Sequence, residues 1–67
     1  MKINSLKIRL LMAEKGLTQT ALSERCGGFT KQNLSLMLSR GSCSDINLVR
    51  IANALGVSAQ EIMKEVQ

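Results

Sequence analysis

The side chains best suited to recognition chemistry stand at the start of segment 30–39. Lys31, Gln32 and Asn33 follow one another, and Ser35 comes two residues later. An ammonium group suits the O6 and N7 acceptors of guanine, and a glutamine amide can pair bidentately with adenine. The sequence has no histidine, no clustered carboxylate pair, no nucleotide-binding glycine motif and no suitable base for a Ser or Cys nucleophile. We therefore expect a binding protein rather than an enzyme, and no cofactor.

Two short helical segments, 18–26 and 30–39, would position these side chains. The pair Gly27-Gly28 breaks the helical pattern between them and permits a sharp reversal. Thr18 and Thr30 stand where the two helices would begin, and threonine is a favourable N-cap. Two helices joined in this way form a helix–turn–helix (HTH), which places the start of its second helix in a groove of DNA.

Segment 30–39 has two distinct faces at about 100° per residue. The inward face is apolar: Leu34, Met37 and Leu38. The outward face carries polar residues and one leucine, with Lys31 at its edge: Gln32, Ser35, Leu36 and Ser39. Three interpretations of Leu36 remain open here: an exposed apolar residue without a role, a contact with a partner protein, or a surface for thymine methyl groups.

Three further helical segments complete the chain. One begins at Asn4 or Ser5 and ends near Lys15, with an expected inward stripe of Leu6, Ile8, Leu11 and Met12. Another begins at Ser44 or Asp45 and stops at Gly56, with an expected inward stripe of Ile46, Leu48, Ile51, Ala52 and Leu55. The last follows a capping-box pattern, Ser58 with Glu61, and contains Ile62, Met63 and Val66. We expect an all-α fold, a compact bundle of about five short helices forming one domain over residues 1–67.

The charge distribution favours a polyanionic partner. The formal net charge is +4, and no acidic residue lies between Glu24 and Asp45, whereas Arg25, Lys31 and Arg40 all do. An ordinary solvated basic surface fits the same charge equally well. No apolar run approaches the roughly 20 residues of a membrane span, and the basic, apolar start lacks a cleavage site. We expect a cytoplasmic protein without membrane contact.

The two cysteines, Cys26 and Cys43, indicate no metal site. A structural zinc site normally needs four nitrogen or sulfur ligands, and two thiols without CxxC spacing do not supply them. A disulfide is disfavoured in a reducing compartment. We interpret both as free thiols, with Cys26 half-buried near a helix end.

Several motifs, taken in order and spacing, resemble the phage repressor and Cro-type HTH regulators, the lambda-repressor-like or XRE family. They are Gly16-Leu17-Thr18-Gln19 leading into Leu22-Ser23, then Leu34-Ser35, Arg40-Gly41, and the run from Leu48 to Val57. This sequence departs from the family pattern at three places. It has an additional residue in the turn 27–30 and another between Leu34 and Gly41, and Ser44 stands where a proline is common.

The resemblance implies a role for individual residues. Gln19 resembles the family glutamine that bonds a phosphate and braces the first side chain of the next helix. The base-reading positions are matched by Lys31, Gln32, Ser35 and Leu36. Contacts with the DNA backbone, which position a protein without specifying sequence, are expected from Thr18, Gln19, Thr30, Asn33, Ser39 and Arg40.

The resemblance also implies the partner, a double-stranded operator bound by a Cro-like transcriptional repressor. A twofold homodimer on a pseudo-palindromic site is expected, formed either in solution or only on DNA. The candidate pairing residues are Ile46, Val57, Met63 and Val66. No small-molecule ligand is expected. The main alternative is an antitoxin-like or adaptor module that uses the same fold to bind protein, whereas RNA binding is disfavoured because there is no aromatic stacking platform.

Overall fold

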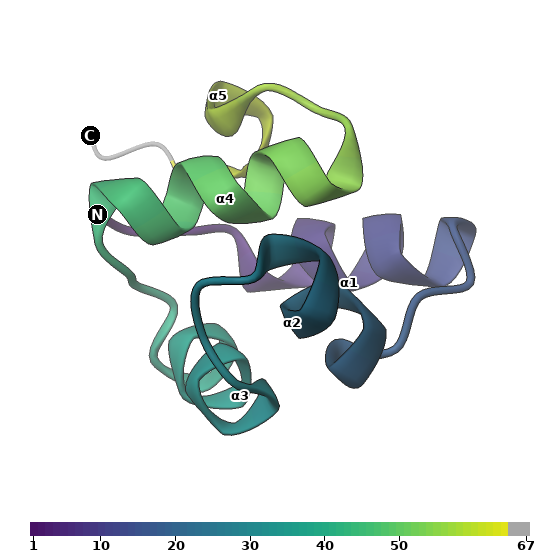
Figure 1. Ribbon diagram of the computed structural model, residues 1–67. Helices are drawn as coiled ribbons and strands as arrows, with labels where there is room; N and C mark the ends of the chain where they lie inside the picture. Colours follow the sequence, from purple (N-terminus) through teal and green to yellow (C-terminus); the bar gives the residue numbers. More distant parts are fainter. Residues whose placement is uncertain (65–67) are drawn as a thin grey trace.

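The computed structural model describes residues 1–64, which form five helices in the predicted order (Figure 1). Their bounds are α1 Ser5–Glu14, α2 Gln19–Cys26, α3 Lys31–Arg40, α4 Asp45–Leu55 and α5 Ala59–Ile62. The all-α fold is therefore confirmed. Figure 1 shows α4 and α5 on one side of the molecule and α3 on the other, with α2 between them.

Local capping chemistry explains where four of the helices begin. In each, the side chain of the N-cap residue accepts a hydrogen bond of 3.1 to 3.3 Å from the backbone N–H three residues later; these residues are Asn4, Thr18, Thr30 and Ser44. An N-cap of this kind contributes about 1 kcal/mol. The predicted capping box of α5 is wrong, because Ser58 makes no side-chain cap bond and its carbonyl accepts from Glu61 N–H instead.

The core is aliphatic and draws on every helix. Its largest fully buried side chains are Ile8, Leu22, Leu34, Leu48, Ile51, Leu55 and Ile62. Removing such a side chain leaves a cavity that costs about 2–5 kcal/mol. The inward faces of α1–α4 therefore fix how α3 is presented.

Two large aliphatic side chains that the sequence predicted to face inward, Leu6 and Ile46, are exposed. Leu6 is 69% exposed and Ile46 is 65% exposed. Each stands two residues before a buried residue, Ile8 or Leu48, and two helical residues differ by roughly 200° around the axis. Both side chains consequently point away from the core, and the apolar stripes of α1 and α4 start later than the sequence suggested.

The N-terminal segment before α1 is part of the fold, which the sequence did not predict. Ile3 is only 2% exposed, and its backbone N–H donates to the Gly41 carbonyl at 2.9 Å. Ile3 also pairs with Met63 in an isolated antiparallel bridge. Met63 was expected in the last helix, but it is extended and follows α5; Val66 lies outside the described residues.

Candidate nucleic-acid interface

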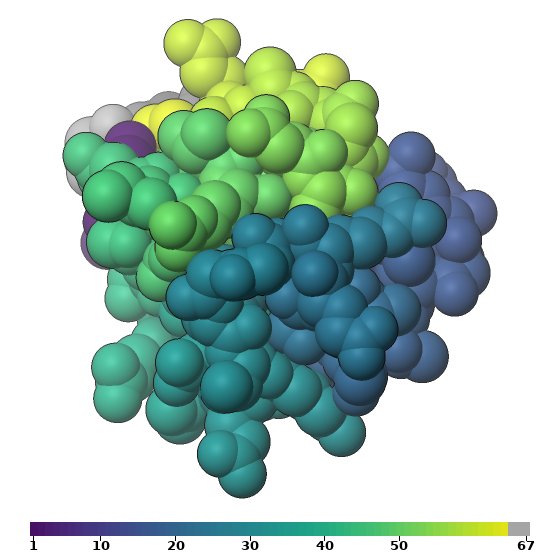
Figure 2. Space-filling model, in the orientation of Figure 1, coloured from purple at the N-terminus to yellow at the C-terminus, as the bar shows by residue number. Residues whose placement is uncertain are grey.

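The outward face of α3 forms one continuous surface at the edge of the molecule, where α3 projects in Figure 2. We call it the reading surface; its residues are Lys31, Gln32, Ser35, Leu36 and Ser39. The opposite face of α3 is buried as predicted, through Leu34, Met37 and Leu38. All four predicted base-reading residues therefore lie together. Leu36 is 50% exposed among them, so the surface combines donors and acceptors with one apolar contact.

A hydrogen bond joins the two helices of the HTH at this surface. The hydroxyl of Ser35 donates to the Oε1 atom of Gln19, and both residues are half-buried. The resemblance led us to expect that Gln19 braces the first side chain of the second helix, which is Lys31. That expectation is wrong: the partner lies one turn further along α3, and Lys31 is exposed. With its oxygen bound to Ser35, the Gln19 amide retains its NH₂ group as a donor.

The start of α2 can hold an anion. The Thr18 hydroxyl oxygen accepts from Ala21 N–H, whereas the backbone N–H groups at the first two helical positions have no acceptor within the helix. A helix N-terminus also carries a partial positive charge. Together with the Gln19 amide NH₂, these donors suit a DNA phosphate beside the reading surface.

The remaining predicted backbone contacts lie at the two ends of α3. Thr30 caps the first turn by accepting from Asn33 N–H at 3.3 Å, and the Asn33 side chain is exposed. Ser39 and Arg40 lie in the last turn and are also exposed. The polar groups suited to phosphates thus bracket the reading surface at both ends.

The end of α3 is held by two contacts with the start of the chain. Gly41 ends the helix in the left-handed region, at φ +70°, and its carbonyl accepts from Ile3 N–H. The Ser5 hydroxyl donates to the Leu38 carbonyl at 2.6 Å. The orientation of α3 therefore depends on the N-terminal segment as well as on the core.

The turn between α2 and α3 is covered by a side chain from α4. Gly27 ends α2 at φ +69°, and a Cβ atom added at Gly28 would lie 1.9 Å from the Arg50 guanidinium. The Cys26 thiol donates to the Arg50 carbonyl at 3.6 Å, and Phe29 packs against the core. The Arg50 side chain thus lies where a side chain at residue 28 would stand, a contact that the sequence did not indicate.

Both cysteines are half-buried free thiols. Burial raises the pKa of the Cys26 thiol, and the positive charge of Arg50 opposes that rise. Burial likewise raises the pKa of the Cys43 thiol. The positive charge of the N-terminal ammonium opposes that rise, and the negative charge of Asp45 adds to it. A protonated thiol is a poor nucleophile and metal ligand. Among residues 1–64, no three His, Cys, Asp or Glu side chains are grouped so as to hold a metal ion.

Comparison with protein-family models decides the family. The model of the Cro/C1-type HTH DNA-binding domain matches residues 7–67. The chain belongs to this family. As a Cro/C1-type domain it is a DNA-binding regulator. No curated protein and no solved structure matches the chain. Within the part of the Cro/C1-type domain that the structure describes, no helix is long and apolar enough to span a membrane.

Proposed function

We propose that this Cro/C1-type domain is a Cro-like transcriptional repressor that reads an operator by placing α3 in the major groove. The observation that carries the proposal is the reading surface, where the predicted base-reading residues gather on an exposed face of the second HTH helix. The family supplies DNA binding, and the side chains of this surface supply the means to distinguish bases.

Four of the five side chains of the reading surface have a preferred base partner, and the fifth, Ser39, would contact the backbone. Lys31 would donate to the guanine O6 and N7 acceptors, Gln32 would pair with adenine, and Leu36 would contact a thymine methyl group. The Ser35 hydroxyl hydrogen is already used by Gln19. Ser35 would therefore act as an acceptor, which selects the exocyclic amines of cytosine or adenine.

The backbone contacts would flank these bases. At one end, the DNA backbone would meet the start of α2 and the hydroxyl and amide groups of four residues: Thr18, Gln19, Thr30 and Asn33. At the other end, Ser39 and Arg40 present a hydroxyl and a guanidinium group. Contacts of this type set the register of a protein on the duplex and give binding its salt dependence.

We propose that two copies bind a pseudo-palindromic operator as a homodimer. The outer face of α4 offers the apolar area for this, because Ile46 is 65% exposed and Val49, one turn later, is 48% exposed. Val57 and Met63 pack partly against the core and would extend the contact. Sedimentation with and without operator DNA tests whether the dimer forms in solution or only on DNA.

Selection of bound sequences from random duplexes tests the proposed function. The expected result is a two-fold symmetric consensus whose binding weakens steeply as salt rises. An antitoxin-like or adaptor role, which exposed Leu36 would favour, predicts instead no enriched sequence and a protein contact nearly indifferent to salt. Either of those two results would replace the repressor proposal.

A further inference from the structure

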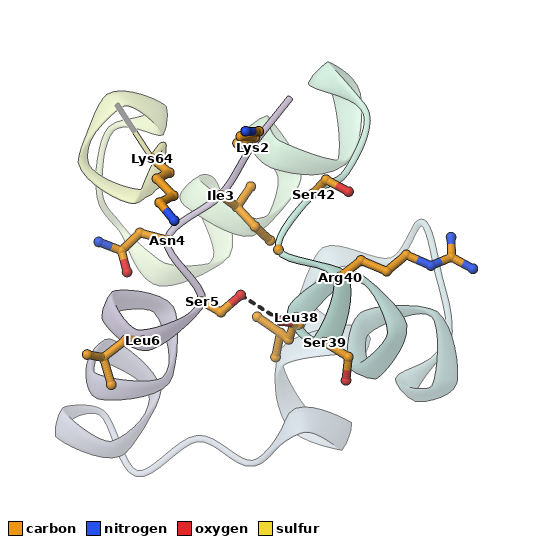
Figure 3. Close-up of a pocket in the computed structure, with 11 residues that line it drawn as sticks. Lys2, Ile3, Asn4, Ser5, Leu6, Leu38, Ser39, Arg40, Ser42 and Lys64 are labelled. Atoms are coloured by element: carbon orange, nitrogen blue, oxygen red, sulfur yellow. Dashed lines mark hydrogen bonds between the residues drawn. The ribbon is translucent and has the colours of Figure 1, made fainter. Parts of the chain in front are cut away.

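A basic groove of about 670 Å³ lies beside the C-terminal end of α3 (Figure 3). Three positively charged residues line it, Lys2, Arg40 and Lys64, and no acidic residue among residues 1–64 does. The hydroxyls of Ser39 and Ser42 also line it. In Figure 3, Lys64 lies at the upper left and Lys2 at the top, and the Arg40 side chain extends to the right, away from both lysines. We call this the basic groove.

Backbone hydrogen bonds bring the two lysines together from opposite ends of the described chain. Lys64 N–H donates to the Lys2 carbonyl at 3.1 Å. Lys2 is itself paired with Ser42 in an antiparallel bridge, next to the bond from Cys43 N–H to the Met1 carbonyl at 2.9 Å. Both lysine side chains are exposed. The backbone is therefore what places these two charges, while their ammonium groups remain available to a ligand.

The basic groove is continuous with the reading surface. Ser39 lines both of them. A DNA strand that leaves the bases under α3 would therefore pass over Ser39 and meet Arg40 and the lysines. Within residues 1–64 these three cations line the groove without a carboxylate, and such a concentration of positive charge favours a polyanion.

We propose that the basic groove binds the phosphodiester backbone next to the bases read by α3, with Lys2 and Lys64 contacting phosphates that none of the predicted site residues reach. The inference rests on the proposed function and extends its footprint. Lysine suits this task because it is a compact point charge that binds phosphate without reading sequence. The groove would thus add affinity equally for all DNA sequences.

The test measures operator affinity over a range of potassium chloride concentrations for wild type, Lys2→Ala, Lys64→Ala and the double variant. Each lost phosphate contact should reduce the slope of log affinity against log salt by about 0.9, and the double variant by about twice that. The loss should be the same on a scrambled duplex. Arg9→Ala is the control, because Arg9 is an exposed cation on α1 that lines neither surface, and its slope should equal that of wild type.

A second measurement locates the contacts. Replacing single flanking phosphates by neutral methylphosphonates should weaken wild-type binding at one or more positions, and Lys2→Ala or Lys64→Ala should abolish that sensitivity at its own position. Alanine retains the backbone bonds that place residues 2 and 64, and melting temperatures equal to wild type verify this.

The outcomes separate the two proposals. If the double variant keeps the wild-type slope while Gln32→Ala still relaxes base preference, the basic groove is refuted and the repressor proposal stands. If Arg9→Ala changes the slope as much as the lysine variants, the effect is one of net charge and the groove is again refuted. If wild type shows no salt-dependent binding to any duplex, both proposals fail.

Discussion

The hydrogen bond from Ser35 to Gln19 offers the sharpest test of how the HTH pair is held. It is a neutral bond between α2 and α3, and both partners are half-buried. A bond of this kind contributes about 0.5–1.5 kcal/mol to the free energy of unfolding. Because water can reach the Gln19 amide once the hydroxyl is removed, we expect Ser35→Ala to cost about 1 kcal/mol. In a domain of this size that lowers Tm by roughly 4–8 °C.

A double-mutant cycle isolates the pair. Urea unfolding of Ser35→Ala, Gln19→Ala and the double variant should give a coupling energy of about 0.5–1.5 kcal/mol. Either single substitution already breaks the bond, so the second substitution cannot remove it again. Ser39→Ala is the control. It removes a hydroxyl from the same face of α3, but that residue is exposed and its side chain makes no hydrogen bond among residues 1–64.

The reasoning would be refuted by additivity. If the double variant loses the sum of the two single losses, Ser35 and Gln19 stabilise the fold independently and the bond does not join the helices. A loss from Ser39→Ala equal to that from Ser35→Ala would refute it as well, since Ser39 has no hydrogen bond to lose among residues 1–64 and alanine has the higher helix propensity.

Three further predictions concern the DNA contacts and the thiols. Gln32→Ala should lower operator affinity by about 1–3 kcal/mol and relax preference at one base position in a competition assay; an equal loss on every sequence would contradict the base-reading role. Arg40→Ala should weaken all duplexes alike and reduce the salt slope by about 0.9; a change in base preference would contradict the backbone role. Cys26 and Cys43 should react with a thiol reagent at neutral pH more slowly in the folded protein than in urea, because burial raises the pKa of each thiol. Because the pKa of each thiol is higher in the folded than in the unfolded protein, the free energy of unfolding is greatest below the unfolded pKa and falls as pH rises through the folded pKa. Unfolding curves at alkaline pH that show no such fall, or equal labelling rates in the folded protein and in urea, would contradict this prediction.

The helix boundaries could be predicted because their causes are local. Thr18, Thr30 and Ser44 each bond a backbone N–H three residues away, so the residue type alone indicates the start of the helix. Gly41 and Gly56 end α3 and α4 with positive φ, which glycine adopts without steric cost. The two faces of α3 follow from the same short-range periodicity, and the base-reading candidates therefore gather as expected.

The inward faces of α1 and α4 were predicted less well. From the sequence alone, an apolar residue near a helix start, such as Leu6 or Ile46, could lie at the end of the buried stripe or just outside it. The direction in which neighbouring helices pack decides between these, and that direction is not encoded within the helix itself. The same reasoning applies to Met63, which pairs with Ile3 instead of continuing α5.

The sequence by itself determined the number of helices, their caps and the polar character of the α3 face, since each depends on residues within one or two turns. Only the tertiary structure decided which distant groups meet. It placed Arg50 over Gly28, joined Ser35 to Gln19, and set Lys2 beside Lys64 at the end of α3. Contacts of this kind depend on how helices cross and where the chain ends return, and no local pattern specifies either.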